Sequence, residues 1–206
     1  IPSMLGALVS MVPASIQEFG QSNLNEGVGL IMNDPHKGGT HLPDIALISP
    51  IFYKSQIYGY VANIAHHQDV GGRSPGSVPG DSTDIYQEGL VIPPLRLVKQ
   101  GQFQDHVLTL LLANVRAPNK RLGDYRAQLA ANTLGLQRVQ TLLTKYDSDT
   151  LRTYMNAILM YTERRMRAAL QEIPSGHYTA TDFLDGDGIT RQPVKIEVEL
   201  TIQDDT

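Results

Sequence analysis

The 206-residue sequence contains no cysteine. Without thiols the chain can have no disulfide framework, no thiolate zinc site and no cysteine nucleophile. Any metal ion must therefore be held by histidine, aspartate and glutamate side chains. The positions of these residues are the first guide to chemistry in this chain.

Long apolar runs are also missing. The longest candidate, residues 107–115, includes Thr109 and Asn114, whereas a membrane-spanning helix needs roughly 18 consecutive apolar residues. The chain begins at Ile1 without an initiator methionine, and its first residues lack the charged and apolar regions of a signal peptide. We expect a soluble protein without a membrane partner, and a fragment or processed chain of cytoplasmic origin.

A concentration of positive charge is absent as well. Acidic residues outnumber basic ones by 21 to 17, and the basic ones are scattered except around Arg164, Arg165 and Arg167. No polycationic stripe that would bind phosphate backbones is visible, so nucleic acid is not expected as a partner. The 41% hydrophobic content is that of a globular protein with one large or two small domains.

Hydrophobic periodicity predicts strands in the first half of the chain. Residues 5–19 form an apolar helical stripe, which Pro13 is predicted to kink or split. Strand-type runs follow at residues 28–32, 45–52 and 57–64, with a short strand at residues 90–98. Residues 66–88 are rich in glycine, proline, serine and aspartate and predict a long loop, which in a compact domain is usually functional or disordered.

The second half of the chain changes period. Residues 104–115, 119–146 and 149–172 predict three helices, whose apolar stripes indicate a core. Alternation returns over residues 177–202, and the Asp-Gly pairs at 185–188 predict a hairpin turn. The sequence therefore predicts an α+β fold with a mixed or antiparallel sheet in the N-terminal half, a helical middle and C-terminal strands. The corresponding parts of this 1–206 segment are a strand-rich region (1–100), a helical region (101–174) and a strand-rich tail (175–206).

Potentially reactive side chains are concentrated in one stretch of the first half. Four of the six histidines fall between residues 36 and 67. Three aspartates lie among or beside them, between residues 33 and 69, and the full set is Asp34, His36, His41, Asp44, His66, His67 and Asp69.

Three members of this set predict a metal site. His41 and Asp44 lie in a glycine-flanked turn that leads directly into a predicted strand. His66 ends the next predicted strand, and antiparallel pairing would bring it back beside Asp44. Two histidines and one carboxylate suit Mn, Fe or Zn and leave positions open for water or substrate, as in a catalytic site. The alternative is that each histidine binds backbone in a turn while the carboxylates cap glycine-rich loops.

Neighbouring residues have predicted roles around this site. His67 and Asp69 could orient the metal ligands. Arg73 could bind a substrate carboxylate or phosphate through two hydrogen bonds, and the hydroxyl of Ser77 could bind substrate because no nucleophile elbow surrounds it. The glycine pairs at 38–39 and 71–72 lack the Lys-Ser or Lys-Thr of a phosphate-binding loop, which favours ordinary turns.

The sequence resembles the hydantoinase B family, which includes the 5-oxoprolinase B region and a subunit of acetone carboxylase. Consecutive segments carry the resemblance in the family's order over nearly the whole chain. These segments are Asn33-Asp34-Pro35, residues 38–44 (Gly-Gly-Thr-His-Leu-Pro-Asp), 65–72 (Ala-His-His-Gln-Asp-Val-Gly-Gly), 75–77, 88–94, 114–116 (Asn-Val-Arg), 123–128 and 161–167.

The resemblance implies a metal-dependent B subunit that works with a hydantoinase A-like, ATP-binding subunit in a hetero-oligomer. Such pairs open a cyclic amide of the hydantoin or 5-oxoproline type, hydrolysing its C–N bond, or carboxylate a ketone. The resemblance also implies that His41, Asp44 and His66 hold a divalent metal (Mn, Zn or Fe), which would lower the pKa of bound water toward ~7. His67 or Asp69 could then transfer protons as catalytic residues.

Two departures from the family pattern support a rival interpretation. Met4 stands where relatives usually carry a histidine, and relatives are about twice as long or more. The leading hypothesis is the hydrolase component, because hydrolysis is the commoner activity in the family. The alternatives are a subunit of an ATP-dependent ketone carboxylase, a truncated non-catalytic assembly module, and a purely structural domain.

Overall fold

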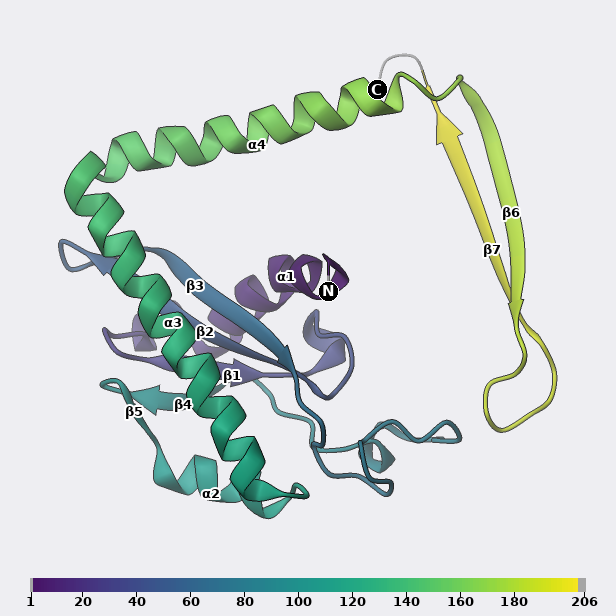
Figure 1. Ribbon diagram of the computed structural model, residues 1–206, viewed down its shortest axis with the longest axis horizontal. Helices are drawn as coiled ribbons and strands as arrows, with labels where there is room; N and C mark the ends of the chain where they lie inside the picture. Colours follow the sequence, from purple (N-terminus) through teal and green to yellow (C-terminus); the bar gives the residue numbers. More distant parts are fainter. Residues whose placement is uncertain (1, 204–206) are drawn as a thin grey trace. The chain divides into compact units, whose positions relative to one another are not determined.

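The computed structural model describes the backbone of residues 2–203 and the side chains from residue 4 to residue 203 (Figure 1). Ile1, where the chain was noted to lack an initiator methionine, lies outside the described residues. The chain divides into two units, Ile1–Thr141 and Leu142–Thr206. Among the described residues, no helix is both long enough and apolar enough to cross a membrane.

The first unit is built on a five-stranded antiparallel sheet with the strand order β3-β2-β1-β4-β5. The antiparallel alternative of the sequence-based prediction is therefore the one observed. The bounds of the strands are Gly29–Met32 (β1), Asp44–Tyr53 (β2), Gln56–His66 (β3), Leu95–Lys99 (β4) and Gln102–Phe103 (β5).

A tight hairpin joins the two longest strands, β2 and β3. Its two-residue turn is formed by Lys54 and Ser55, whose φ angles of 49° and 65° are both positive. Two consecutive positive φ angles are typical of the turn that matches the twist of a two-stranded ribbon. This turn starts a ladder that runs without interruption to the pair Asp44 and His66, apart from one register shift between Ile51 and Phe52.

Helices cover both faces of the sheet because the strand residues alternate in direction. On β1, Leu30 and Met32 face α1 (Pro2–Phe19), whereas Ile31 faces α2 (Asp105–Ala113) and α3 (Pro118–Tyr146). Figure 1 shows the sheet between α1 on one side and α3 on the other. The helix α1 continues through Pro13, so of the predicted kink or split, the split is not observed.

Amide side chains attach α3 to the edge of the sheet. The Nδ2 group of Asn132 donates to the carbonyl oxygen of Leu47 and to the hydroxyl of Ser49, both at 3.0 Å. Its Oδ1 accepts a 2.7 Å hydrogen bond from Asn63 of β3. These groups are buried or half-buried, so each satisfied bond avoids a desolvation cost. Helix and sheet approach closely here, since a Cβ on Gly135 would lie 2.7 Å from Cγ1 of Val61.

The strand predicted at residues 90–98 is shorter than expected, because β4 begins only at Leu95. The two prolines that precede it have no N–H group to donate to a ladder. Asn33 replaces the missing strand contacts: its Nδ2 donates to the carbonyl oxygen of Leu90 (2.9 Å), and its Oδ1 accepts from the N–H of Ile92 (2.6 Å).

The second unit contains α4 (Ser148–Leu170) and a two-stranded antiparallel hairpin of β6 (Gly176–Leu184) and β7 (Val194–Ile202). Asp147 caps α4, since its carboxylate accepts from the N–H groups of Asp149 and Thr150. The helical middle and the C-terminal strands are therefore confirmed. The Asp-Gly pairs lie in the connection between β6 and β7, as predicted.

The amide contacts of α3 lead to a prediction about stability. Replacing Asn132 with Ala should lower the free energy of unfolding by roughly 1–3 kcal/mol, because buried partners on β2 and β3 lose their hydrogen bonds. The exposed neighbour Thr133, changed to Ala, is the matched control and should stay within about 0.5 kcal/mol of the parent chain. Urea unfolding followed by circular dichroism measures both. Equal effects of the two substitutions would contradict the role given to Asn132.

Candidate metal centre

The histidine and aspartate side chains predicted to hold a metal converge at one end of the β2–β3 ladder. Asp44 begins β2, His66 ends β3, and the two residues are paired in the register. Nδ1 of His66 lies 2.6 Å from Oδ1 of Asp44, and Nδ1 of His41 lies 3.4 Å from Oδ2. One potential ligand atom from each of the three residues lies within 4.8 Å of the others. The predicted pairing that brings His66 beside Asp44 is thus confirmed.

Asp44 is the buried member of the triplet. The hydroxyl of Thr40 donates to its Oδ2, and the backbone N–H of His41 donates to the same oxygen at 3.3 Å. Burial alone would raise the pKa of Asp44, but hydrogen bonds from Thr40, His66 and the His41 backbone outweigh it and leave the pKa below its ordinary value. The carboxylate is therefore charged at neutral pH and available to attract a cation.

The two histidines leave the centre open to solvent on one side. Their side chains are 75% exposed for His41 and 49% exposed for His66, against 2% for Asp44. A carboxylate can only accept, so Nδ1 of His66 donates in its contact with Asp44, and Nε2 is the ring atom that could bind a metal. The triplet therefore presents one fixed anion and two adjustable imidazoles toward the same opening.

The donor set fits a divalent ion. Ligand bonds of about 2.1 Å in a tetrahedral site place ligand atoms about 3.4 Å apart, whereas the candidate ligand atoms lie up to 4.8 Å apart here, so binding an ion requires a movement of roughly 1 Å. The exposed ring of His41 can supply it by rotating about its side-chain torsions. Imidazole and carboxylate together suit Zn, Mn or Fe, and three protein ligands leave room for water or substrate.

His67, the next residue after His66, points to the opposite side of the sheet. Its side chain is buried and its ring packs against Tyr125 with the centroids 4.9 Å apart. Both N–H groups of Gln128 Nε2 are used, on the carbonyl of Ile45 and on Oδ1 of Asn63. Oε1 of Gln128 must therefore accept the 2.9 Å bond from Nε2–H of His67.

Burial keeps His67 neutral. Burial is the main cause of its lowered pKa, and the contact with Gln128 only partly opposes this effect. Nδ1 is shielded from solvent and has no hydrogen-bond partner among the residues that the structure describes. The geometry makes His67 an anchor between α3 and the end of β3, and the proton-transfer role remains a prediction.

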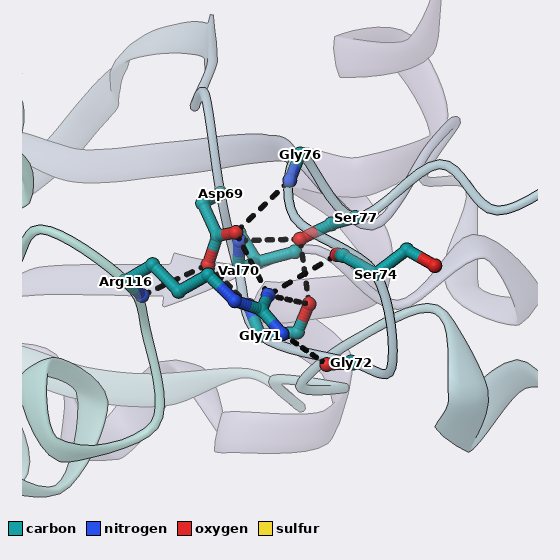
Figure 2. A network of polar contacts seen from close by, with 8 residues as sticks. All are labelled: Asp69, Val70, Gly71, Gly72, Ser74, Gly76, Ser77 and Arg116. Carbon is teal, nitrogen blue, oxygen red and sulfur yellow. Dashed lines mark hydrogen bonds and ion pairs between the residues drawn. The ribbon is translucent and has the colours of Figure 1, made fainter.

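Asp69 and Arg116 form a clamp within the glycine-rich loop, as Figure 2 shows. Oδ1 of Asp69 accepts from the N–H groups of Gly71 (3.0 Å) and Arg116 (2.9 Å). Oδ2 accepts from the N–H of Gly76 (3.1 Å) and from the Arg116 guanidinium (3.0 Å). The same guanidinium also donates to the backbone carbonyls of Gly71, Gly72 and Ser74. Because both carboxylate oxygens accept hydrogen bonds in this way, Asp69 holds the conformation of the loop. The catalytic role predicted for Asp69 remains a prediction.

Ser77 and Arg73, predicted to bind substrate, occupy different positions in this loop. The hydroxyl of buried Ser77 accepts from the N–H of Val70 and donates to the carbonyl of Gly71, each at 2.8 Å. Arg73 is exposed and pairs with Asp81. The substrate contacts of both residues remain predictions, and Ser77 has already committed its hydroxyl to the turn.

The clamped turn also holds the segment that follows it. The N–H of Arg73 donates to the carbonyl of Gln87 (2.8 Å), and the N–H of Leu90 donates to that of Val70 (2.9 Å). Contact is so close that a Cβ on Gly72 would lie 2.5 Å from the carbonyl carbon of Glu88. The chain at Gln87 to Leu90 is thereby held against the glycine-rich loop. Residues 82–85 and 88 line a cavity together with Thr40 and His41.

Sequence reasoning assigned no role to three residues that support the centre, namely Thr40, Arg116 and Gln128. The adjacency of Thr40 to His41 was the available signal for the first. Arg116 and Gln128 lie 47 and 61 positions from the residues they bind, Asp69 and His67. No local pattern reveals such pairs.

The end of the sheet thus carries two histidines and a buried aspartate, beside a clamped glycine-rich loop, and these three side chains could hold a divalent metal ion. Comparison with known proteins is more specific. The sequence profile described as hydantoinase B/oxoprolinase matches residues 1–206, and the chain belongs to this family.

Relatives with named activities extend the comparison. The chain is 35% identical to the 5-oxoprolinase of Dictyostelium discoideum, covering 98% of this chain and 16% of the relative. The crystal structure of the ATP-dependent caprolactamase from Pseudomonas jessenii matches with a TM-score of 0.90 at 34% identity, over 100% of this chain and 35% of that one. Nucleotide-free acetone carboxylase matches in fold alone, with a TM-score of 0.76 at 19% identity over 98% and 28% of the two chains. The chain thus spans about a third or less of the length of these proteins.

The environment of Asp69 predicts how stability depends on pH. Burial alone would raise its pKa, but hydrogen bonds from Arg116, Gly71 and Gly76 lower it below the ordinary value. A lowered folded-state pKa gives stability that is present above the unfolded-state pKa of about 3.9 and is lost as pH falls through the folded-state value.

Asp69→Asn should therefore lower the unfolding free energy by roughly 1–3 kcal/mol at pH 7, where charge-assisted bonds are lost. The difference from the parent chain should shrink as pH falls below about 4. Urea unfolding at a series of pH values measures both effects, with exposed Asp185→Asn as the control. A difference that does not change with pH would show that the charge of Asp69 is not what stabilises the turn.

Proposed function

We propose that this chain is the metal-holding part of a B-type subunit in an ATP-coupled hydrolase that opens a cyclic amide. The observation that carries the proposal is the convergence of His41, Asp44 and His66 at the open end of the β2–β3 ladder. Family membership supports it, because relatives named 5-oxoprolinase and caprolactamase act on cyclic amides.

The residues of the centre have distinct proposed roles. Asp44 supplies a permanent negative charge, which Thr40 holds in place through its hydroxyl. His41 and His66 supply imidazole nitrogens from exposed positions, and together the three would hold a divalent ion such as Mn, Zn or Fe. When bound, such an ion polarises a carbonyl or phosphoryl oxygen and makes water a better nucleophile near neutral pH.

ATP is assigned to a partner in this proposal. The glycine pairs of the chain form turns, and neither is followed by the lysine and hydroxyl residues of a phosphate-binding loop. The structural relative from P. jessenii is described as ATP-dependent, and its sequence counterpart is a β subunit. A hydantoinase A-like, ATP-binding subunit in a hetero-oligomer would supply the phosphoryl group to the substrate.

Hydrolysis is favoured over ketone carboxylation by the level of similarity. The likeness to acetone carboxylase is one of fold, whereas the named relatives above 30% identity include the two cyclic-amide enzymes. The truncated, non-catalytic alternative predicts that the triplet binds no metal.

Metal content tests the centre directly. After incubation with Mn, Zn or Fe salts and removal of free ions, the purified chain should retain close to one equivalent of metal by elemental analysis. His66→Ala should lose it, because Asp44 and His41 alone form a weak two-ligand site. The exposed His106→Ala is the matched control and should retain the metal.

The parent chain and both variants should then be assayed with an A-type subunit and ATP for ring opening of a lactam. Turnover should require ATP and metal, and should be lost in His66→Ala but not in His106→Ala. An absence of metal from the parent chain under all these conditions would overturn the metal centre and favour the non-catalytic alternative.

A further inference from the structure

The strand β3 forms one edge of the five-stranded sheet, and among the described residues its only strand neighbour is β2. The strand at the opposite edge, β5, has two residues, whereas β3 has eleven. Every residue from Ile57 to Ala65 is half-buried, although residues Asp44 to Ile51 of β2 are all buried. Since helices cover both faces of the sheet, the greater exposure of β3 comes from its unpaired outer side.

The hydrogen bonds of the β2–β3 ladder determine which backbone groups of β3 point outward. The N–H of His67 donates to the carbonyl of Pro43 just beyond the last strand pair, so that last pair is a non-hydrogen-bonded one. The two kinds of pair alternate from there, and Pro50, which has no N–H, lies opposite Tyr60 in another non-hydrogen-bonded pair. Four residues of β3 therefore direct their N–H and C=O groups away from β2. They are Tyr60, Ala62, Ile64 and His66.

This edge lacks the usual protection against the addition of another strand. Proteins commonly protect an exposed sheet edge with charged side chains, with proline or by keeping the edge strand short. The strand β3 is long and contains no proline, lysine, arginine, aspartate or glutamate. Its backbone groups are therefore suited to pair with a further strand.

A cavity of about 620 Å³ lies between this edge and α1. Its walls combine residues 57–60 of β3 with residues of α1 that include Pro13 and Ile16. None of the residues that line the cavity is charged. The cavity can therefore accept apolar side chains from whatever lies against the edge.

An exposed apolar stripe continues the wall of this cavity along α1. Leu5, Val9 and Pro13 are spaced four residues apart, so they lie on the same face of the helix. Pro13 lines the cavity, whereas Leu5 and Val9 are 63% and 76% exposed. Such a stripe on the surface indicates contact with another apolar surface.

The direction of α1 places the stripe and the cavity beside opposite halves of the edge. Leu8 and Ile64 pack against one buried cluster, and Ile16 and Ile57 pack against another. The helix α1 is therefore antiparallel to β3. The stripe lies beside the half of β3 near the candidate metal centre, and the cavity lies beside the half near the tight turn.

We propose that two copies of this chain pair through β3 about a two-fold axis and join their sheets into one. A two-fold axis perpendicular to the sheet makes the two β3 strands antiparallel and turns the stripe of each copy toward the cavity of the other. Because the paired surfaces carry no lysine, arginine, aspartate or glutamate, identical surfaces do not repel each other. This complementarity of the surface with itself favours a second copy over an unrelated partner.

The register of the pairing follows from the length of the strand. All eleven residues of β3 overlap when the axis passes through Val61, the central residue. Tyr60 then lies opposite Ala62 of the second copy, and both residues direct their N–H and C=O groups toward each other. The same register brings Gln56 of the second copy opposite His66, beside the candidate metal centre.

The area of this contact predicts a dimer of moderate affinity. Eleven strand residues span about 37 Å, and the strand with the adjoining helix layer is about 15 Å deep, so each copy would bury roughly 550 Å². The total of roughly 1,100 Å² lies at the low end of specific interfaces. Dissociation at micromolar concentrations is therefore expected.

A single introduced thiol can report the pairing, because the chain contains no cysteine. Val61→Cys places two thiols opposite each other in a non-hydrogen-bonded pair, whose Cα atoms lie about 4.5 Å apart, a separation that a disulfide spans. Mild oxidation should convert most of this variant to a covalent dimer on non-reducing electrophoresis. Ala65→Cys, on the same face of β3, is the matched control. Its two thiols would lie about 27 Å apart and should not form a disulfide.

Sedimentation velocity over a range of micromolar concentrations measures the association without a disulfide. Ala62→Pro removes an outward N–H and leaves the bonds to β2 intact, and Val9→Lys introduces a charge into the stripe. Each substitution should raise the dimer dissociation constant by about tenfold or more, because the two-fold axis repeats the lost contact. Val198→Lys, at an exposed apolar position of β7, is the control and should leave the constant unchanged. Circular dichroism should show that all the variants are folded.

Three results would overturn the proposal. The first is a parent chain that stays monomeric, and the second is a Val61→Cys variant that forms disulfides no faster than Ala65→Cys. The third is a dimer that Val198→Lys weakens and Ala62→Pro does not, which would place the contact in the second unit. If the parent chain is monomeric and Ala62→Pro prevents it from binding an A-type subunit, the edge belongs to that partner instead.

Discussion

The antiparallel register between β2 and β3 is the constraint on which the candidate centre depends. It places Asp44 opposite His66, and side chains on a strand alternate between the two faces. A slip of one residue would turn His66 toward α3 and bring His67 toward the solvent side, so the triplet would be lost. The apolar residues of β2 hold the register, because Ala46 and Ile48 pack with α1 while Ile45 and Leu47 pack with α2 and α3.

Buried hydrogen bonds between α3 and the sheet fix the position of this helix. Apolar packing between α3 and the sheet could be satisfied by several small displacements of the helix. The bonds of Gln128 and Asn132 to individual backbone carbonyls allow only one of them. Through Gln128, His67 shares in this attachment, which links the position of α3 to the last residues of β3. The clamp of Asp69 and Arg116 extends the same principle to the loop and to the cavity wall beyond it.

The sequence predicted what depends on local pattern. Strand alternation and helical stripes identified most elements, and the short span from His41 to Asp44, followed by a returning strand, led to the triplet. Long-range polar contacts could not be read in this way, since the bond from Arg116 to Asp69 depends on how α2 and α3 pack. The strand expected at residues 90–98 was overestimated because a side chain, Asn33, satisfies the backbone there. The cavity lined by His41, Asp84 and Glu88 could not be predicted, because His41 lies far in the sequence from the other two residues.

The tight turn at Lys54 and Ser55 lies at the opposite end of the ladder from the centre. Local unfolding of a hairpin begins at its open end, because few strand pairs must break there. Asp44 and His66 are the outermost pair, so the centre lies where local opening would otherwise be easiest. The bond from the N–H of His67 to the carbonyl of Pro43 closes the ladder just beyond that pair. Amide protons near the candidate centre should therefore exchange with solvent at a rate set by the opening of this hydrogen bond, not by global unfolding.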